Sequence, residues 1–218
     1  WHYIDRKILS FHEGINFFTG HSGSGKSTVI DAMQLVLYAN TDGRGFFNKA
    51  AADWICSVAD SHKYRILMGT GKLNQYDAVM KRFADNGVDT EKYDDITISE
   101  YIYNMDVAMN AADLVISRAG ASTLAELTAI GKPAILVPSP YVTDNHQEHN
   151  ARAIERGGGA AVIPEPELSA KSIDAAVSDI VSSKTKLVEM GTNSAKMGVP
   201  DSADRICKEV LRLIDKNK

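Results

Sequence analysis

Apolar residues along this chain occur in two alternating arrangements, short continuous runs and longer stretches with helical spacing. Continuous runs such as residues 133–138 are typical of strands that are buried on both faces of a sheet. Stretches with apolar positions three and four apart, such as residues 121–130, are typical of helices that bury one face. The runs predict strands over residues 4–9, 14–19, 64–68, 96–99, 114–116, 133–138 and 160–163. The spaced stretches predict helices over residues 28–38, 51–59, 74–84, 105–112, 121–130, 145–155, 169–182, 184–197 and 203–214.

This alternation of strands and helices through short loops predicts the fold class. It is typical of an α/β domain with a parallel, doubly wound, Rossmann-like sheet. Ligands of such sheets bind at the carboxyl ends of the strands. We therefore expect the functional residues in the loops that follow the strands.

The overall composition narrows the classes of function. The 218 residues carry a net charge of -4, which argues against a general nucleic-acid-binding protein, so no nucleic-acid partner is predicted. Cys56 and Cys207 lack the spacing of a metal site and predict reduced thiols in a cytoplasmic protein. No apolar run reaches the ~20 residues of a membrane span. The chain begins with Trp1 rather than Met, so we expect a fragment or a product whose start is missing.

A glycine-rich loop follows the strand predicted over residues 14–19. Residues 20–27 (Gly-His-Ser-Gly-Ser-Gly-Lys-Ser) match G-x-x-x-x-G-K-[ST] in full, and a helix follows, which is the context of a P-loop. In a P-loop, backbone N–H groups surround a phosphate chain; here Lys26 would reach the outer phosphates and Ser27 would hold Mg²⁺. The predicted ATP phosphate site comprises Gly20, Ser22, Gly23, Ser24, Gly25, Lys26, Ser27 and Thr28. The alternative is a flexible Gly/Ser turn that carries a lysine by chance.

A second anion site is predicted where the strand over residues 114–116 leads into the next helix. Ala119 and Gly120 form a small-residue turn, and a helix start offers unpaired N–H groups and a favourable dipole to an anion. Glu126 lies about one turn into the helix, where a carboxylate can accept hydrogen bonds from sugar hydroxyls. As an alternative, Thr123 and Glu126 fit a capping box, in which Glu126 serves only its own helix.

Three blocks of sequence resemble the C-terminal domain of the MurG family. They are residues 117–126 (Ser-Arg-Ala-Gly-Ala-Ser-Thr-Leu-Ala-Glu), 131–138 (Gly-Lys-Pro-Ala-Ile-Leu-Val-Pro) and 144–151 (Asp-Asn-His-Gln-Glu-His-Asn-Ala), in the family's order and spacing. The resemblance covers residues 51–218 and implies the C-terminal half of a GT-B glycosyltransferase. It implies transfer of N-acetylglucosamine from UDP-GlcNAc to lipid-linked muramyl-pentapeptide in peptidoglycan synthesis, with no cofactor required for the transfer.

The resemblance also implies which residues hold the donor. Ile102 would pack on the uracil and Gln147 would contact the donor sugar, although Ile102 also fits a core isoleucine in a turn. The implied UDP-GlcNAc site comprises Ile102, Ala121, Ser122, Thr123, Leu124, Ala125, Glu126 and Gln147. In the family, the acceptor site and the proposed base belong to an N-terminal domain, so no catalytic residue is identified here. Peripheral attachment at the inner face of the cell membrane is attributed mainly to that domain and stays open.

Other interpretations of neighbouring residues are also open. Asp144 and Gln147 fit a helix-capping pair. Arg118 either directs a diphosphate or forms a surface salt bridge. His146 and His149 lie on one helix face, but no further ligand has the spacing of a metal site, so no metal is expected there.

Residues 1–50 resemble a different family. Residues 11–20, the P-loop, residues 31–37 and residues 44–50 are similar to the N-terminus of an SMC/SbcC/MukB-like ATPase. The coiled coil, the signature motif and the Walker B strand of those ATPases are not found, so ATP–Mg²⁺ binding is predicted without organised hydrolysis. We expect two segments, residues 1–50 and 51–218. Three interpretations are open. The chain is a glycosyltransferase half in which a P-loop unit replaces the family's own βα unit, or it is an ATP-binding module, or it is a non-functional splice of two genes. The splice is favoured because the ATPase resemblance stops abruptly.

Overall fold

The computed structural model describes residues 44–71 and 73–216. The strands of this part are parallel and form two sheets. The first sheet pairs β1 (Ile66–Gly69) with β2 (Ile96–Ser99). The second has the order β3 (Val115–Ser117), β4 (Ala134–Leu136) and β5 (Ala160–Val162). The predicted parallel α/β arrangement is therefore confirmed, with two short sheets in place of one continuous ladder.

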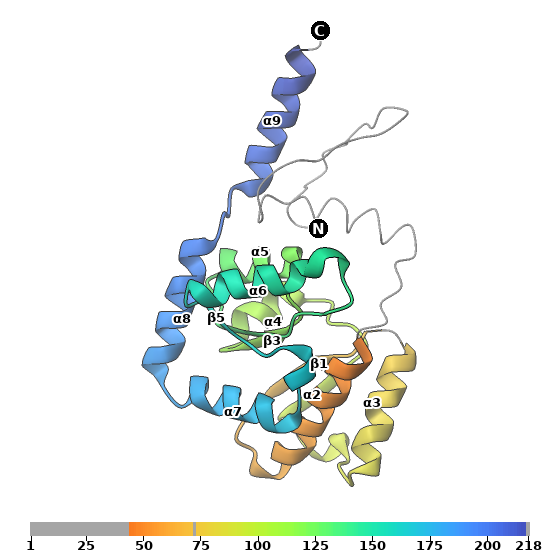
Figure 1. Cartoon of the computed structure of the whole chain (residues 1–218). Coiled ribbons are helices and arrows are strands. Elements are labelled where there is room, and N and C mark those ends of the chain that lie inside the picture. Colours follow the sequence, from red (N-terminus) through yellow and green to blue (C-terminus); the bar gives the residue numbers. More distant parts are fainter. Residues whose placement is uncertain (1–43, 72, 217–218) are drawn as a thin grey trace.

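Helices connect the strands and pack around the sheets (Figure 1). In chain order they are α2 (Arg44–Val58), α3 (Leu73–Asp85), α4 (Met105–Ala111), α5 (Ala121–Ala129), α6 (His146–Arg156), α7 (Ala170–Val181), α8 (Lys184–Met197) and α9 (Ser202–Lys216). Among the described helices, none combines the length and the apolar character that crossing a membrane requires.

The core is divided between the two faces of the second sheet. Ile135 and Leu136 are neighbours on β4 and are both fully buried, but they belong to different apolar clusters. Ile135 packs in the larger cluster with side chains of α2 and α7 and with Met68 of β1 and Ile96 of β2. Leu136 packs in the smaller cluster with Leu127 of α5. Successive side chains of a strand point to opposite faces, so covering both faces requires the continuous apolar run seen in the sequence.

The largest difference from the predicted elements concerns α2. This helix was expected over residues 51–59, but it begins at Arg44. Phe47, Ala51 and Trp54 continue one apolar stripe and pack in the larger cluster. The predicted start was wrong because the junction between the two family resemblances was taken as an element boundary, whereas the helical spacing continues through it. Elements predicted before residue 44 lie outside the described residues.

The last helix, α9, extends away from the rest of the described chain (Figure 1). It contributes no residue to either apolar cluster, and Leu211, Leu213 and Ile214 on it are about half exposed. Arg212 forms an ion pair with Glu209 within the helix. The fold of the domain is therefore built by the strands and by helices α2 to α8.

Candidate functional site

The carboxyl ends of the parallel strands define one edge of each sheet. Ile102 lies in the loop after β2, α5 begins in the loop after β3, and Gln147 lies in α6, which follows β4. Because these strands are parallel, the structure places the sequence-predicted donor residues of the described region on loops or helix starts at the carboxyl ends of strands. This is the position at which ligands bind in open α/β sheets.

The first turn of α5 presents backbone N–H groups at the carboxyl end of β3. Its N-cap is Gly120, with extended φ of -65° and ψ of 143°, and Leu124 N–H donates to Gly120 O at 3.0 Å. Among the described residues no side-chain capping bond is seen at this end, and the first turn carries no acidic residue. The N–H groups of residues 121–123 therefore have no acceptor within the helix, and the helix dipole favours an anion there. A Cβ atom on Gly120 would meet, among the described residues, only the Thr123 hydroxyl at 3.9 Å, so these residues leave space beside the turn.

The capping-box alternative for Thr123 and Glu126 is wrong. A capping box requires its Ser or Thr at the N-cap, but that position is Gly120 and Thr123 is the third residue of the helix. Glu126 lies in the second turn and is half-buried, while Leu124 and Leu127 supply the buried face of α5. The carboxylate is thus on the partly exposed side of the helix rather than in the core.

Ile102 packs over the end of β1. A Cβ atom built on Gly69 would lie 3.2 Å from Cδ1 of Ile102, so the isoleucine covers the place where Gly69 has no side chain. Ile102 is half-buried and lies between two exposed tyrosines, Tyr101 and Tyr103, whose ring centroids are 5.6 Å apart. These tyrosines were not among the candidate binding residues predicted from the sequence. Aromatic residues in a loop after a strand are a sequence signal for a binding site.

Gln147 is held by the loop that follows β4. Its Oε1 accepts a hydrogen bond from Ser139 N–H at 2.9 Å, which fixes the plane of the side-chain amide. The alternative of an Asp144–Gln147 capping pair is wrong, because the N-cap of α6 is Asn145, with no side-chain capping bond. Asp144 and Asn145 have φ of 53° and 49°, left-handed conformations that Asp and Asn adopt more readily than most residues.

Arg118 forms a buried ion pair. It contacts Glu165 at the start of η4 (Glu165–Glu167), and the two side chains are only 19% and 7% exposed. Its Nη1 donates to Val137 O at 3.3 Å, and its guanidinium lies 5.4 Å from the ring centroid of Phe47. Of the two alternatives for Arg118, the structure supports the ion pair, but in a largely buried position rather than on the open surface. The sequence around Arg118 does not predict that Glu165 is its partner.

The other residues singled out in the sequence are the histidines of α6, which do not add to this site, and the P-loop. His146 Nδ1 is 2.9 Å from Thr143 O, so this ring is engaged by its own loop. Within the described region, no group of three His, Cys, Asp or Glu side chains has the arrangement of a metal site. The P-loop, residues 20–28, lies outside the described residues.

These features define the class of the protein: a parallel α/β domain of the GT-B glycosyltransferase type. Its fold is similar to that of MurG from Acinetobacter baumannii, with a TM-score of 0.62 and 22% identity over 77% of this chain and 46% of that one. It is also similar to the glycosyltransferase VinC in complex with dTDP, with a TM-score of 0.55 and 15% identity over 76% of this chain and 37% of that one.

The chain belongs to glycosyltransferase family 28, whose C-terminal domain model matches residues 41–206. It is similar to two proteins described as UDP-N-acetylglucosamine–N-acetylmuramyl-(pentapeptide) pyrophosphoryl-undecaprenol N-acetylglucosamine transferase. The one from Desulforamulus reducens is 39% identical over 188 residues, 86% of this chain and 50% of that protein. The one from Finegoldia magna is 30% identical over 239 residues, 99% of this chain and 63% of that protein. The chain thus spans between half and two thirds of the length of these relatives.

A second family model overlaps the first. The P-loop containing region of AAA domain matches residues 1–54, so residues 41–54 are shared between the two matches. The shared residues include most of α2, whose apolar stripe packs in the core of the glycosyltransferase domain.

Proposed function

We propose that this chain is the UDP-GlcNAc-binding half of an N-acetylglucosaminyltransferase of peptidoglycan synthesis. The activity by which the relatives are named supports this donor, and their greater length supports the view that the chain provides only part of the enzyme. The single observation that carries the proposal is the start of α5 at the carboxyl end of β3, with Gly120 as its N-cap residue, followed by the half-buried carboxylate of Glu126 one turn later. A diphosphate next to a ribose has the charge and hydroxyl groups that these two features bind.

In this proposal the donor lies across α5, the loop after β2 and the start of α6. The diphosphate lies at the N–H groups of residues 121–123, the ribose hydroxyls donate to Glu126, the uracil packs on Ile102, and the sugar contacts Gln147. Transfer is attack by an acceptor hydroxyl on the anomeric carbon, with UDP leaving. The helix start stabilises the negative charge that develops on the leaving diphosphate. No metal or cofactor takes part in this step.

The acceptor in this proposal is lipid-linked muramyl-pentapeptide, bound only where an N-terminal half is supplied. We expect the chain alone to bind UDP-GlcNAc with little or no transfer. Its proposed location is the cytoplasm, with attachment at the inner face of the cell membrane provided mainly by that half.

Calorimetry with UDP-GlcNAc tests the donor site. Loss of the Glu126 carboxylate in Glu126→Ala removes hydrogen bonds worth roughly 1.5–3 kcal/mol, so we expect binding to weaken about 10- to 100-fold. Glu189→Ala is the matched control, because Glu189 is an exposed carboxylate on α8, away from this edge. Absence of binding at millimolar ligand, or equal binding by the two variants, would contradict the proposal.

A second candidate function is ATP binding at the P-loop of a segment formed by residues 1–50, and the AAA-type match to residues 1–54 favours it. Its test is ATP–Mg²⁺ binding that is lost in Lys26→Ala while UDP-GlcNAc binding is unchanged. If neither nucleotide binds, the remaining explanation is a non-functional splice. Sequencing reads that run uninterrupted across the codons for residues 49–54 would argue against that explanation.

A further inference from the structure

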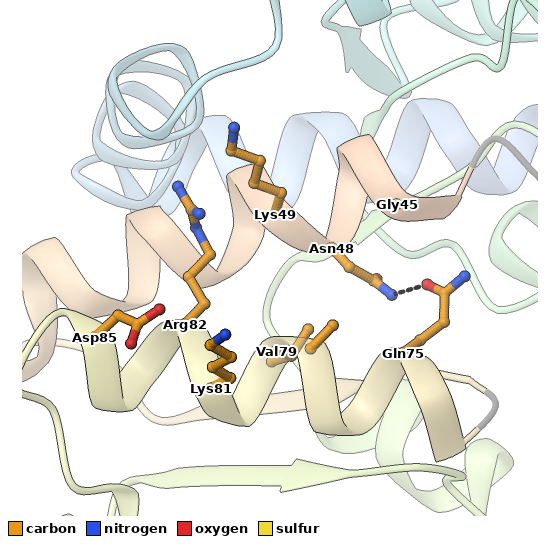
Figure 2. A pocket seen from close by; sticks show the side chains of 9 residues that line it. Gly45, Asn48, Lys49, Gln75, Val79, Lys81, Arg82 and Asp85 are labelled. Carbon is orange, nitrogen blue, oxygen red and sulfur yellow. Dashed lines mark hydrogen bonds between the residues drawn. The ribbon is translucent and has the colours of Figure 1, made fainter.

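A cavity of about 500 Å³ lies between α2 and α3 (Figure 2). None of the residues assigned to the donor site lines it. This volume is in the range of small-molecule sites, roughly 300–1,000 Å³. The polar and charged residues of its wall are Asn48, Lys49, Gln75, Lys81, Arg82 and Asp85.

The buried Asn48 side chain connects the two helices that form the cavity. Asn48 is 6% exposed, and its Nδ2 donates to Gln75 Oε1 at 2.7 Å and to Thr70 O at 2.9 Å. The bond to Gln75 connects α2 with α3 (Figure 2), and the bond to Thr70 connects α2 with the residue after β1. Because buried amides need their partners, the spacing of the two helices is fixed by these bonds.

The charges of the wall favour an anion. Lys49 and Lys81 are exposed, and neither makes a hydrogen bond or an ion pair within the described part of the chain. Arg82 is held by Asp53, with Nη2 donating to Oδ2 at 2.7 Å and Nε to Oδ1, and its Nη1 is not used in this pair. In Figure 2, Lys49 and Arg82 extend to the same side of the helix pair. Asp85 is the single carboxylate among the lining residues, against three cations, in a chain whose net charge is -4.

We propose that this cavity binds a small phosphate-bearing anion, with Lys49 and Lys81 as its direct cationic ligands. Arg82 supplies a third donor through Nη1, and Asp53 fixes its orientation. Several charged N–H donors around one cavity suit a phosphate, which offers several acceptor oxygens and more than one negative charge. The first turn of α2 carries no acidic residue, so the helix dipole there adds to the attraction.

The test is a titration of the ¹⁵N-labelled full chain with pyrophosphate, at constant ionic strength, followed by NMR. We expect saturable shifts in residues 45–49 and 75–85. Lys49→Ala with Lys81→Ala should weaken binding by about tenfold or more, since two charge-assisted contacts are lost. The control is Lys184→Ala with Lys208→Ala, which removes the same charge from exposed positions outside the cavity and should leave the affinity within about twofold.

Three results would overturn the inference: shifts that do not saturate, equal weakening in both double variants, or shifts confined to residues 120–126. The positions of the shifts separate this site from the donor site, because pyrophosphate bound at the start of α5 would shift residues 120–126 instead of residues 45–49 and 75–85. If UDP-GlcNAc fails to bind while the pyrophosphate site is found, the donor proposal fails and the cavity remains.

Discussion

The side chain of Ile102 lies over the backbone of Gly69, so that a Cβ atom at Gly69 would approach Cδ1 of Ile102 to 3.2 Å. This contact joins the loop after β2 to the end of β1. Within the proposed donor site, it sets the position of the residue that packs on the uracil. A side chain at position 69 is therefore expected to act on binding through Ile102.

Gly69→Ala should weaken UDP-GlcNAc binding by roughly 1 kcal/mol, because the added methyl displaces Ile102. Calorimetry on the variant measures this. In Gly69→Ala with Ile102→Val, the clashing Cδ1 is removed and we expect most of the affinity to return. If the double variant binds no better than Gly69→Ala, displacement of Ile102 is not the cause.

The side-chain amide of Gln147 has an acceptor, which binds Ser139 N–H, and an N–H₂ donor, and a substitution can remove the donor alone. In Gln147→Glu the carboxylate still accepts from Ser139 N–H, so the loop after β4 should keep its conformation, but the N–H₂ donor is lost. We expect UDP-GlcNAc binding to weaken about tenfold or more in this variant, with an unchanged melting temperature. Affinity equal to that of the unmodified chain would show that Gln147 acts only by holding the loop.

The Arg118–Glu165 pair should be important for stability. Arg118→Met leaves a carboxylate that is 7% exposed without its cation, and breaking a buried pair in this way typically costs about 3–5 kcal/mol. Urea denaturation measures the loss in free energy of unfolding. Arg118→Met with Glu165→Leu should recover most of it, because no buried charge is then left unpaired. A loss below about 1 kcal/mol in the single variant would mean that Glu165 finds water or another donor.

Cys56 is expected to react slowly with iodoacetamide near neutral pH. Burial raises the pKa of the Cys56 thiol, the neighbouring Asp53 carboxylate raises it further, and Arg82 lowers it to a smaller extent. Because the thiolate is the reactive form, a raised pKa shifts the onset of alkylation to higher pH.

Asp53→Asn should lower the pKa of Cys56 and accelerate its alkylation about threefold or more at fixed pH. Peptide mass mapping across a pH series gives the rate for this site. Asp60→Asn, which also removes an acidic side chain from the region after α2, is the control and should leave the rate unchanged. Equal rates in the two variants would mean that burial alone controls the thiol.

Much of the architecture follows from local sequence pattern. The helix of residues 121–129 starts at the position predicted from the small-residue turn, and the apolar run at residues 133–138 contains the fully buried strand β4. The helix at residues 44–58 was predicted seven residues too late, because a junction between two resemblances was given more weight than the apolar spacing of Phe47, Ala51 and Trp54.

What the sequence determined by itself is therefore the parallel α/β class, the helix start after β3 and the family. These depend on residues a few positions apart or on contiguous motifs. Only the tertiary structure decided that Gly120, and not Thr123, is the N-cap residue of α5, that Arg118 pairs with Glu165, and that Ile102 packs on Gly69. The two contacts, like the cavity between α2 and α3, join residues that are distant along the chain. They exist because parallel strands bring separate loops to a common edge, and no local pattern specifies which side chains meet there.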